Sequence, residues 1–200
     1  MPKMVDHTER RAAIALAAAA AIAEIGLEGT TVREIARRSG FSKGIVEHYF
    51  TGKADIIAAA LGQMNARYLA REQQQTRGLK GLEALRARVY CVLPLDKETR
   101  QEWKIRLAFW SVAAIDDDAR KEQRLRLKLT RERFKADLEQ AVELGEINRT
   151  CDTEHTATKL GLFMVGTSCS ALMDSRYYHK NLLIELIEDI LQQTTPGARP

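Results

Sequence analysis

Apolar residues recur along most of this chain at spacings of three and four, which is the period of a helix rather than a strand. Ile14, Ala18, Ile22 and Ile25 form one such stripe near the N-terminus. The pattern predicts an all-α chain of about nine helices, separated by glycine, proline or polar turns. The expected helices span about 8–25, 32–39, 43–50, 53–75, 79–93, 97–114, 119–144, 153–173 and 181–192.

The second and third of these helices carry the clearest boundary signals. Thr31 with Glu34 has the spacing of a capping box, and Ser42 is a second good N-cap. Gly40 between the helices suits the positive φ of a tight turn. Two short helices in this arrangement predict a helix-turn-helix over about residues 31–50. We therefore expect a three-helix N-terminal domain over residues 1–52 and a helical effector-binding and dimerisation domain over residues 53–200.

The helix after Ser42 has the chemistry of a DNA-reading element. Val46 and Phe50 are four residues apart and should face inward, which turns basic and small side chains outward. The first residues of such a helix meet base edges in the major groove, where Lys43 can donate to guanine. The candidate DNA contacts lie on this helix or at neighbouring helix starts: Thr31, Arg33, Ser42, Lys43, Gly44, His48, Tyr49 and Lys53. The alternative is a plain packing motif whose charged side chains are simply solvated.

Charge supports DNA binding only weakly. The net charge is +4, and residues 1–53 hold eight Lys or Arg against six Asp or Glu, a net of +2. Binding must therefore depend on where the charges lie. Residues 120–135 hold eight Lys or Arg and two Glu, a net of +6, which is more typical of the solvated face of a long helix than of a nucleic-acid surface.

Several other classes of protein are disfavoured. The three cysteines, Cys91, Cys151 and Cys169, lack metal-binding spacing, and we expect no metal and no cofactor. No signal-peptide layout or bilayer-length apolar run is present, which predicts a soluble cytoplasmic protein without a membrane partner. No nucleophile elbow, phosphate-binding loop or zinc-protease motif suggests an enzyme. The alternative to a DNA-binding regulator is a helical dimeric adaptor or ligand-binding protein that does not bind DNA.

An aromatic cluster marks a candidate effector site. Trp103, Leu107 and Trp110 recur at i, i+4 and i+7, and Tyr68 and Phe109 come from nearby segments. Aromatic faces can enclose a quaternary ammonium through cation–π contact. The alternative is that this stripe is ordinary core packing, the commoner role of such residues.

The last two expected helices predict a dimer. They combine small residues, which permit close helix approach, with a broad leucine and isoleucine stripe. Two such helices from each subunit would form a four-helix interface, and the alternative is an internal core. The candidate interface residues are Leu162, Phe163, Gly166, Ser170, Leu183, Leu186, Ile187 and Ile190.

The string IARRSGFSKGIVEHYFTGKADII resembles the N-terminal domain of TetR-family repressors. The likeness covers about residues 8–68 and implies a homodimer on a palindromic operator, released by a small-molecule effector. The strings GIVEHYF and WKIRLAFW are similar to one branch, the choline-responsive (BetI-like) repressors of glycine-betaine synthesis, which implies an effector such as choline. Glu47 departs from the family pattern, where an aromatic residue is frequent, so the operator sequence does not carry over.

Overall fold

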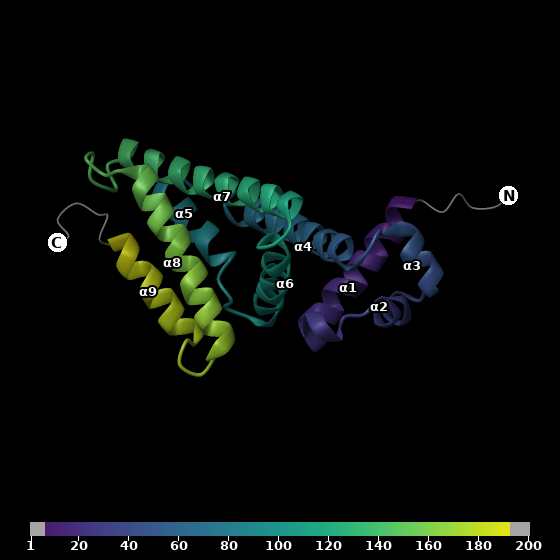
Figure 1. The fold of residues 1–200 in the computed structure, drawn as a ribbon. Coiled ribbons are helices and arrows are strands. Elements are labelled where there is room, and N and C mark those ends of the chain that lie inside the picture. The colour runs from purple at the N-terminus through teal and green to yellow at the C-terminus, as the bar shows by residue number, and fades with distance from the viewer. Residues whose placement is uncertain (1–6, 193–200) are drawn as a thin grey trace. The chain divides into compact units, whose positions relative to one another are not determined.

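The computed structural model describes residues 7–192, and within that range the chain forms nine helices and no strand (Figure 1). This confirms the expected all-α architecture. The helices are α1 (His7–Gly29), α2 (Val32–Ser39), α3 (Lys43–Tyr49), α4 (Lys53–Gln75), α5 (Gly81–Tyr90), α6 (Lys97–Ala113), α7 (Asp117–Glu143), α8 (Thr153–Met173) and α9 (Lys180–Gln192).

The caps of α2 and α3 lie where the sequence predicts them. Thr31 Oγ1 accepts a hydrogen bond from Glu34 N at 3.2 Å, and Ser42 Oγ accepts one from Ile45 N at 3.3 Å. Gly40 has a φ of 74° in the turn between the helices. A full capping box would also have the Thr31 backbone N–H donate to the Glu34 carboxylate. That part of the prediction is wrong, because the Glu34 carboxylate binds Arg37 and Arg38 instead.

The expected end of the first helix is confirmed, whereas the bounds of the fifth differ. In α1 the regular helical conformation breaks at Gly26, with φ 74° and ψ 178°, directly after the expected span of 8–25. Ile25 beside this break is 45% exposed rather than part of the buried stripe. The helix α5 is shorter than predicted. It begins at Gly81, which has a φ of 52°, and ends at Tyr90, ahead of Pro94. Backbone conformation at Gly81 therefore sets a start for α5 that apolar periodicity does not show.

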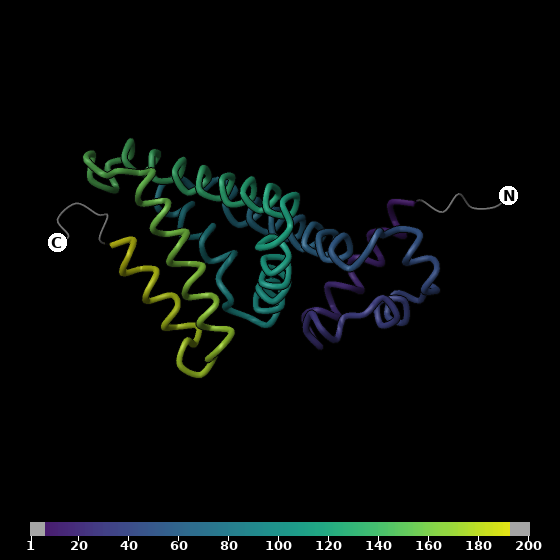
Figure 2. Tube along the Cα trace, viewed as in Figure 1, coloured from purple at the N-terminus to yellow at the C-terminus, as the bar shows by residue number. Residues whose placement is uncertain are grey.

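The chain divides into two compact units. The first contains the described residues up to 67 together with 104–121, and the second contains 68–103 together with 122–192. The helices α4, α6 and α7 each contribute residues to both units. Each of the three is drawn as a continuous helical trace in Figure 2. The boundary expected between residues 52 and 53 stays a prediction.

The first unit has a continuous apolar core made by α1, α2, α3, the first part of α4 and the last part of α6. Its buried members include Ile14, Ala18, Ile22, Ile35, Val46, Phe50, Ile56, Leu61, Met64 and Phe109. Among the described residues, α1 is the one helix long and apolar enough to cross a membrane, a criterion that core helices of soluble proteins also meet. Since α1 buries Ile14, Ala18 and Ile22 in this core, we interpret it as such a helix.

The second unit encloses charged groups as well as apolar ones. Arg88 on α5 binds the Asp137 carboxylate on α7 at 2.7 Å and also contacts Glu72 on α4. Arg71 binds Glu102 at 2.9 Å and donates to the carbonyl of Cys91 at 3.0 Å. These ion pairs join helices that are distant in sequence, so they help to fix how the unit packs.

Candidate functional site

The helix α3 presents its polar face to solvent. Val46 is fully buried and Phe50 is buried after it, which holds the opposite side of the helix outward. The residues on that exposed side are Ser42, Lys43, Gly44, Glu47 and His48. A short capped helix with one buried edge and one open polar face has the form that fits a major groove.

Gly44 has no structural reason to be a glycine. It lies inside α3, and a Cβ added there would meet nothing nearer than Ser42 Oγ at 4.0 Å. Glycine disfavours helix relative to alanine, so packing within the chain does not explain this glycine on an exposed face. The absence of a side chain leaves the backbone of α3 open at this point.

Other predicted contact residues lie at helix starts and are exposed: Thr31, Arg33 and Lys53. Thr31 uses its oxygen as an acceptor for the cap, which leaves its O–H as a donor. Arg37 and Arg38 on the same helix are held by Glu34 and Glu24. Hydrogen bonds from Arg37 and Arg38 lower the pKa of Glu34 to about 2.

Tyr49 is held by the first turns of α1. Its hydroxyl lies 3.0 Å from Nδ1 of His7, and its backbone carbonyl accepts from Arg11. Arg11 also binds Asp55 at 2.7 Å and lies 4.2 Å from the Phe50 ring centre. The start of α1 therefore positions the end of α3, a role that periodicity alone did not reveal.

The five expected effector residues divide between the two units. Tyr68 and Trp103 are buried in the second unit, where Trp103 Nε1 donates to the carbonyl of Val92 at 2.7 Å. Leu107, Phe109 and Trp110 belong to the first unit, and Phe109 is fully buried in its core. That they enclose a ligand stays a prediction.

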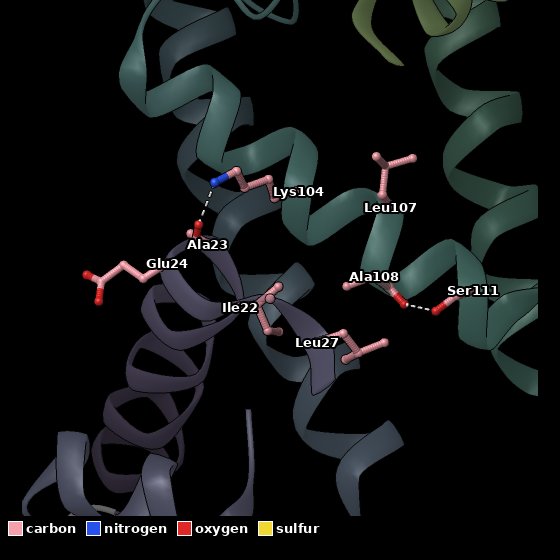
Figure 3. Close-up of a pocket in the computed structure, with 9 residues that line it drawn as sticks. Ile22, Ala23, Glu24, Leu27, Lys104, Leu107, Ala108 and Ser111 are labelled. Atoms are coloured by element: carbon pink, nitrogen blue, oxygen red, sulfur yellow. Dashed lines mark hydrogen bonds between the residues drawn. The ribbon is translucent and has the colours of Figure 1, made fainter. Parts of the chain in front are cut away.

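A hollow of about 370 Å³ lies in the first unit beside the end of α1 and the last part of α6. Figure 3 shows Lys104 reaching from α6 to the backbone of α1, where Nζ donates to the carbonyl of Ala23 at 2.8 Å. Leu107 is the one predicted effector residue in this lining. Ile22, Leu27 and Ala108 make the hollow mostly apolar. Sequence pattern does not predict this hollow, because its walls come from segments about eighty residues apart.

The predicted dimer residues fall into two groups. Leu183 and Ile187 are buried within the single chain, so they pack the core of the second unit. The other six are at least partly exposed: Leu162, Phe163, Gly166, Ser170, Leu186 and Ile190. Leu162 is 71% exposed, whereas a leucine in the middle of a helix is usually buried. The helices that carry them, α8 and α9, lie side by side (Figure 1).

The helix α9 is held to α5 by polar contacts. Glu188 accepts from Arg86 at 2.7 Å and from the hydroxyl of Tyr90. Burial and the bond to Glu188 raise the pKa of Tyr90 to about 12. These contacts fix which face of α9 is turned inward and which is left open.

The basic stretch of α7 is largely paired with acidic residues. Arg131 and Lys135 bind Glu154 on α8, and Lys128 binds Glu132. Arg126 binds Glu122, and Arg133 lies 3.2 Å from the buried Glu72. This supports the interpretation of the stretch as a solvated, salt-bridged face.

Among residues 7–192, no group of three or more His, Cys, Asp or Glu side chains is placed to hold a metal ion.

Two family models match the chain. One, described as bacterial regulatory proteins of the tetR family, covers residues 14–60. The other, the C-terminal domain of BetI-type transcriptional repressors, covers residues 81–196. Both families are transcriptional regulators rather than enzymes, as the sequence predicts.

Individual curated relatives are also transcriptional regulators. The transcriptional regulator BetI 1 of Chromohalobacter salexigens is 30% identical over 132 residues, which is 62% of this chain and 63% of that protein. Alignments with the first curated relatives span 58 to 65% of those proteins' length.

Solved structures match over nearly the whole chain. A transcriptional regulator from Rhodococcus sp. Rha1 is 29% identical with a TM-score of 0.82, covering 95% of this chain and 99% of that one. A transcriptional regulator from Saccharomonospora viridis, solved in complex with choline, is 20% identical with a TM-score of 0.87, covering 94% and 98%.

Proposed function

The chain belongs to the TetR family of bacterial transcriptional regulators, and from that membership we propose that it is a ligand-responsive repressor. It binds a palindromic DNA operator as a homodimer and is released by a small-molecule effector. The open polar face of α3, with its unneeded glycine at position 44, is the observation that carries this proposal. The protein works in the cytoplasm, where its operator lies.

The DNA contacts divide into reading and positioning roles. Lys43 and His48 on α3 face base edges, and Gly44 lets the helix backbone come close to them. Hydroxyl, ammonium and guanidinium groups at neighbouring helix starts hold phosphates. These positioning groups are Thr31, Arg33, Ser42 and Lys53, and the Tyr49 hydroxyl at the end of α3 adds a hydrogen bond to the DNA backbone.

Dimerisation sets the distance between the two reading helices. The open faces of α8 and α9, including Leu162, Phe163 and Leu186, meet their counterparts in a second copy across a twofold axis. Two α3 helices then reach successive major grooves about one DNA turn apart. The helix α4 starts at Lys53, directly after the helix-turn-helix, and runs unbroken to Gln75. A ligand that shifts this helix changes the spacing of the reading helices, and the operator is released by a population shift.

The effector is a small apolar or cationic molecule, and a quaternary ammonium such as choline is the first candidate. Support comes from the BetI-type match of residues 81–196 and from the choline complex of the Saccharomonospora protein. Aromatic faces at Tyr68 and Trp103, both in the second unit, supply the chemistry that such a cation needs.

The DNA-binding proposal is tested by selecting duplexes from a random library and then measuring affinity as salt is varied. Recovery of a palindrome, with affinity falling steeply as salt rises, is the expected result. Tyr49→Ala should weaken binding to all sequences alike. Recovery of no preferred sequence favours instead the helical adaptor that does not bind DNA.

The dimer and the effector need separate measurements. Sedimentation should give a dimer, and Leu162→Glu should shift it toward monomer while leaving the helical signal intact; Leu144→Glu, another exposed leucine, is the matched control. A wild-type protein that is strictly monomeric would contradict the proposed dimer mechanism.

For the effector, choline, betaine aldehyde and a broad metabolite panel are scanned for changes in Tm and operator affinity. If no compound changes either quantity, the effector proposal loses its support.

A further inference from the structure

Two opposite charges stand together on the exposed face of α3. Lys43 and Glu47 are one helical turn apart, and Lys43 Nζ lies 3.1 Å from Glu47 Oε1. Their side chains are 64% and 52% exposed, so the pair is set on the surface rather than in the core. A donor and an acceptor are therefore presented side by side at the start of the reading helix.

Nothing in the fold requires the carboxylate at position 47. Glu47 has no described ion pair other than the one with Lys43, and an exposed pair of this kind adds at most a few tenths of a kcal/mol to a helix. A carboxylate on a DNA-binding face also repels phosphates, which lowers affinity for every sequence. A residue that gains little stability and costs general affinity is best explained by a gain in sequence discrimination.

The spacing of the pair matches the edge of one kind of base pair. In the major groove guanine presents N7 and O6 as acceptors, and its partner cytosine presents the N4 amino group as a donor. O6 and N4 are hydrogen-bonded to each other at about 2.9 Å. That separation is close to the 3.1 Å between the lysine nitrogen and the glutamate oxygen.

We propose that Lys43 and Glu47 act together to read a guanine–cytosine pair in each half of the operator. Lys43 donates to guanine N7 and O6, and Glu47 accepts from cytosine N4. Each charge meets its complement on the DNA without losing the other, so the ion pair stays intact on binding. Gly44, directly beside Lys43, leaves room for the helix to come within reach of the bases.

An adenine–thymine pair satisfies this arrangement less well. Glu47 can accept from adenine N6 and Lys43 can donate to thymine O4, but the lysine then loses the second acceptor that guanine offers. The thymine methyl group also lies beside O4 and takes water away from the charged pair. The expected preference for guanine–cytosine at this position is on the order of tenfold in affinity.

The experiment starts from the duplex that wild-type protein selects from a random library, because the inference rests on the proposed DNA binding. Each base pair of one half-site is replaced in turn, and affinities are measured for wild type, Lys43→Ala, Glu47→Ala and the double variant. We expect one guanine–cytosine position where replacement by adenine–thymine weakens wild-type binding on the order of tenfold. Both single variants should reduce that preference, and the double variant should reduce it no further than the more affected single variant.

The matched control is the pair Lys128–Glu132 on α7, which has the same spacing in sequence and exposures of 62% and 53%. Glu132→Ala should leave the preference at every position unchanged. Glu47→Gln sharpens the test, because an amide can instead make two hydrogen bonds to adenine and should move the preference toward adenine–thymine.

Two outcomes overturn the inference, and both are distinct from failure of the proposed function. If Glu47→Ala strengthens binding to all duplexes by the same factor, the carboxylate is only a solvated charge that repels phosphates. The same conclusion follows if no guanine–cytosine position responds to either variant. If instead wild type binds all duplexes with equal affinity and selects none, the proposed function itself fails.

Discussion

The two units treat charge in different ways. In the first unit the carboxylates of the described ion pairs are all at least 21% exposed. In the second unit Glu72, Glu102 and Asp137 are only 5 to 9% exposed and are paired with Arg71 and Arg88. Charges in the first unit remain accessible to another molecule, whereas these three buried carboxylates of the second unit hold helices together.

This difference matches the division of labour that we propose. A surface that reads DNA needs charges that keep most of their hydration until the partner arrives. A buried pair is useful for a different reason: breaking it leaves an uncompensated charge, so it strongly disfavours any other packing. The second unit is therefore built to keep its helices in defined relations, as a module that responds to a ligand requires.

The largest expected effect comes from removing the charge at the centre of the buried network. Arg88→Met leaves Glu72 and Asp137 without their shared partner and should destabilise the second unit by about 3–5 kcal/mol. Urea unfolding followed by circular dichroism measures the change. Lys128→Met, which breaks the exposed pair with Glu132, is the matched control and should cost no more than about 1 kcal/mol. Equal effects of the two variants would erase the contrast between the units.

Both units have helices with side-chain N-caps, and we expect removal of a cap to destabilise either unit by a smaller and similar amount. Asp152 Oδ1 accepts from His155 N at 2.9 Å at the start of α8, as Thr31 does at the start of α2. Thr31→Ala and Asp152→Ala should each cost about 1 kcal/mol. Thermal unfolding and amide exchange of the first turns check this. A cap variant without effect would show that tertiary packing alone sets that boundary.

The smallest effect concerns the pH dependence of the first unit. Arg37 and Arg38 hold the pKa of Glu34 at about 2, below its ordinary value of 4.5. This stabilisation is therefore present above about pH 4.5 and is lost as pH falls through about 2. Glu34→Gln should slightly lower stability near neutral pH, and the difference from wild type should vanish in strong acid. A difference that persists there would mean that Glu34 acts by packing rather than by charge.

The two units also differ in how much of their structure could be predicted from the sequence. Thr31 and Ser42 cap α2 and α3 through hydrogen bonds to residues three positions away, so the local sequence pattern was enough to predict where these helices begin. The bond between Arg88 and Asp137 joins residues 49 positions apart, and that between Arg86 and Glu188 spans 102. Composition and periodicity carry no information about such pairs, since the residues next to an arginine in sequence do not show which distant carboxylate it binds.

The same limit applies to the candidate sites. The exposed face of α3 followed from Val46 and Phe50, because helical spacing determines which side is buried. The placement of Leu183 and Ile187 inside the chain, with Leu186 and Ile190 more open, did not follow. A broad apolar stripe can serve an internal core and a dimer interface at once, and only the packed structure separates the two.

We propose that the chain meets DNA through α3 and not through the more basic α7. Duplex affinity of Lys43→Glu compared with Lys128→Glu tests it most directly, because both lysines are exposed and both changes reverse one charge. We expect Lys43→Glu to abolish binding to the selected duplex and Lys128→Glu to bind as wild type does. Equal losses, or a loss confined to Lys128→Glu, would contradict it.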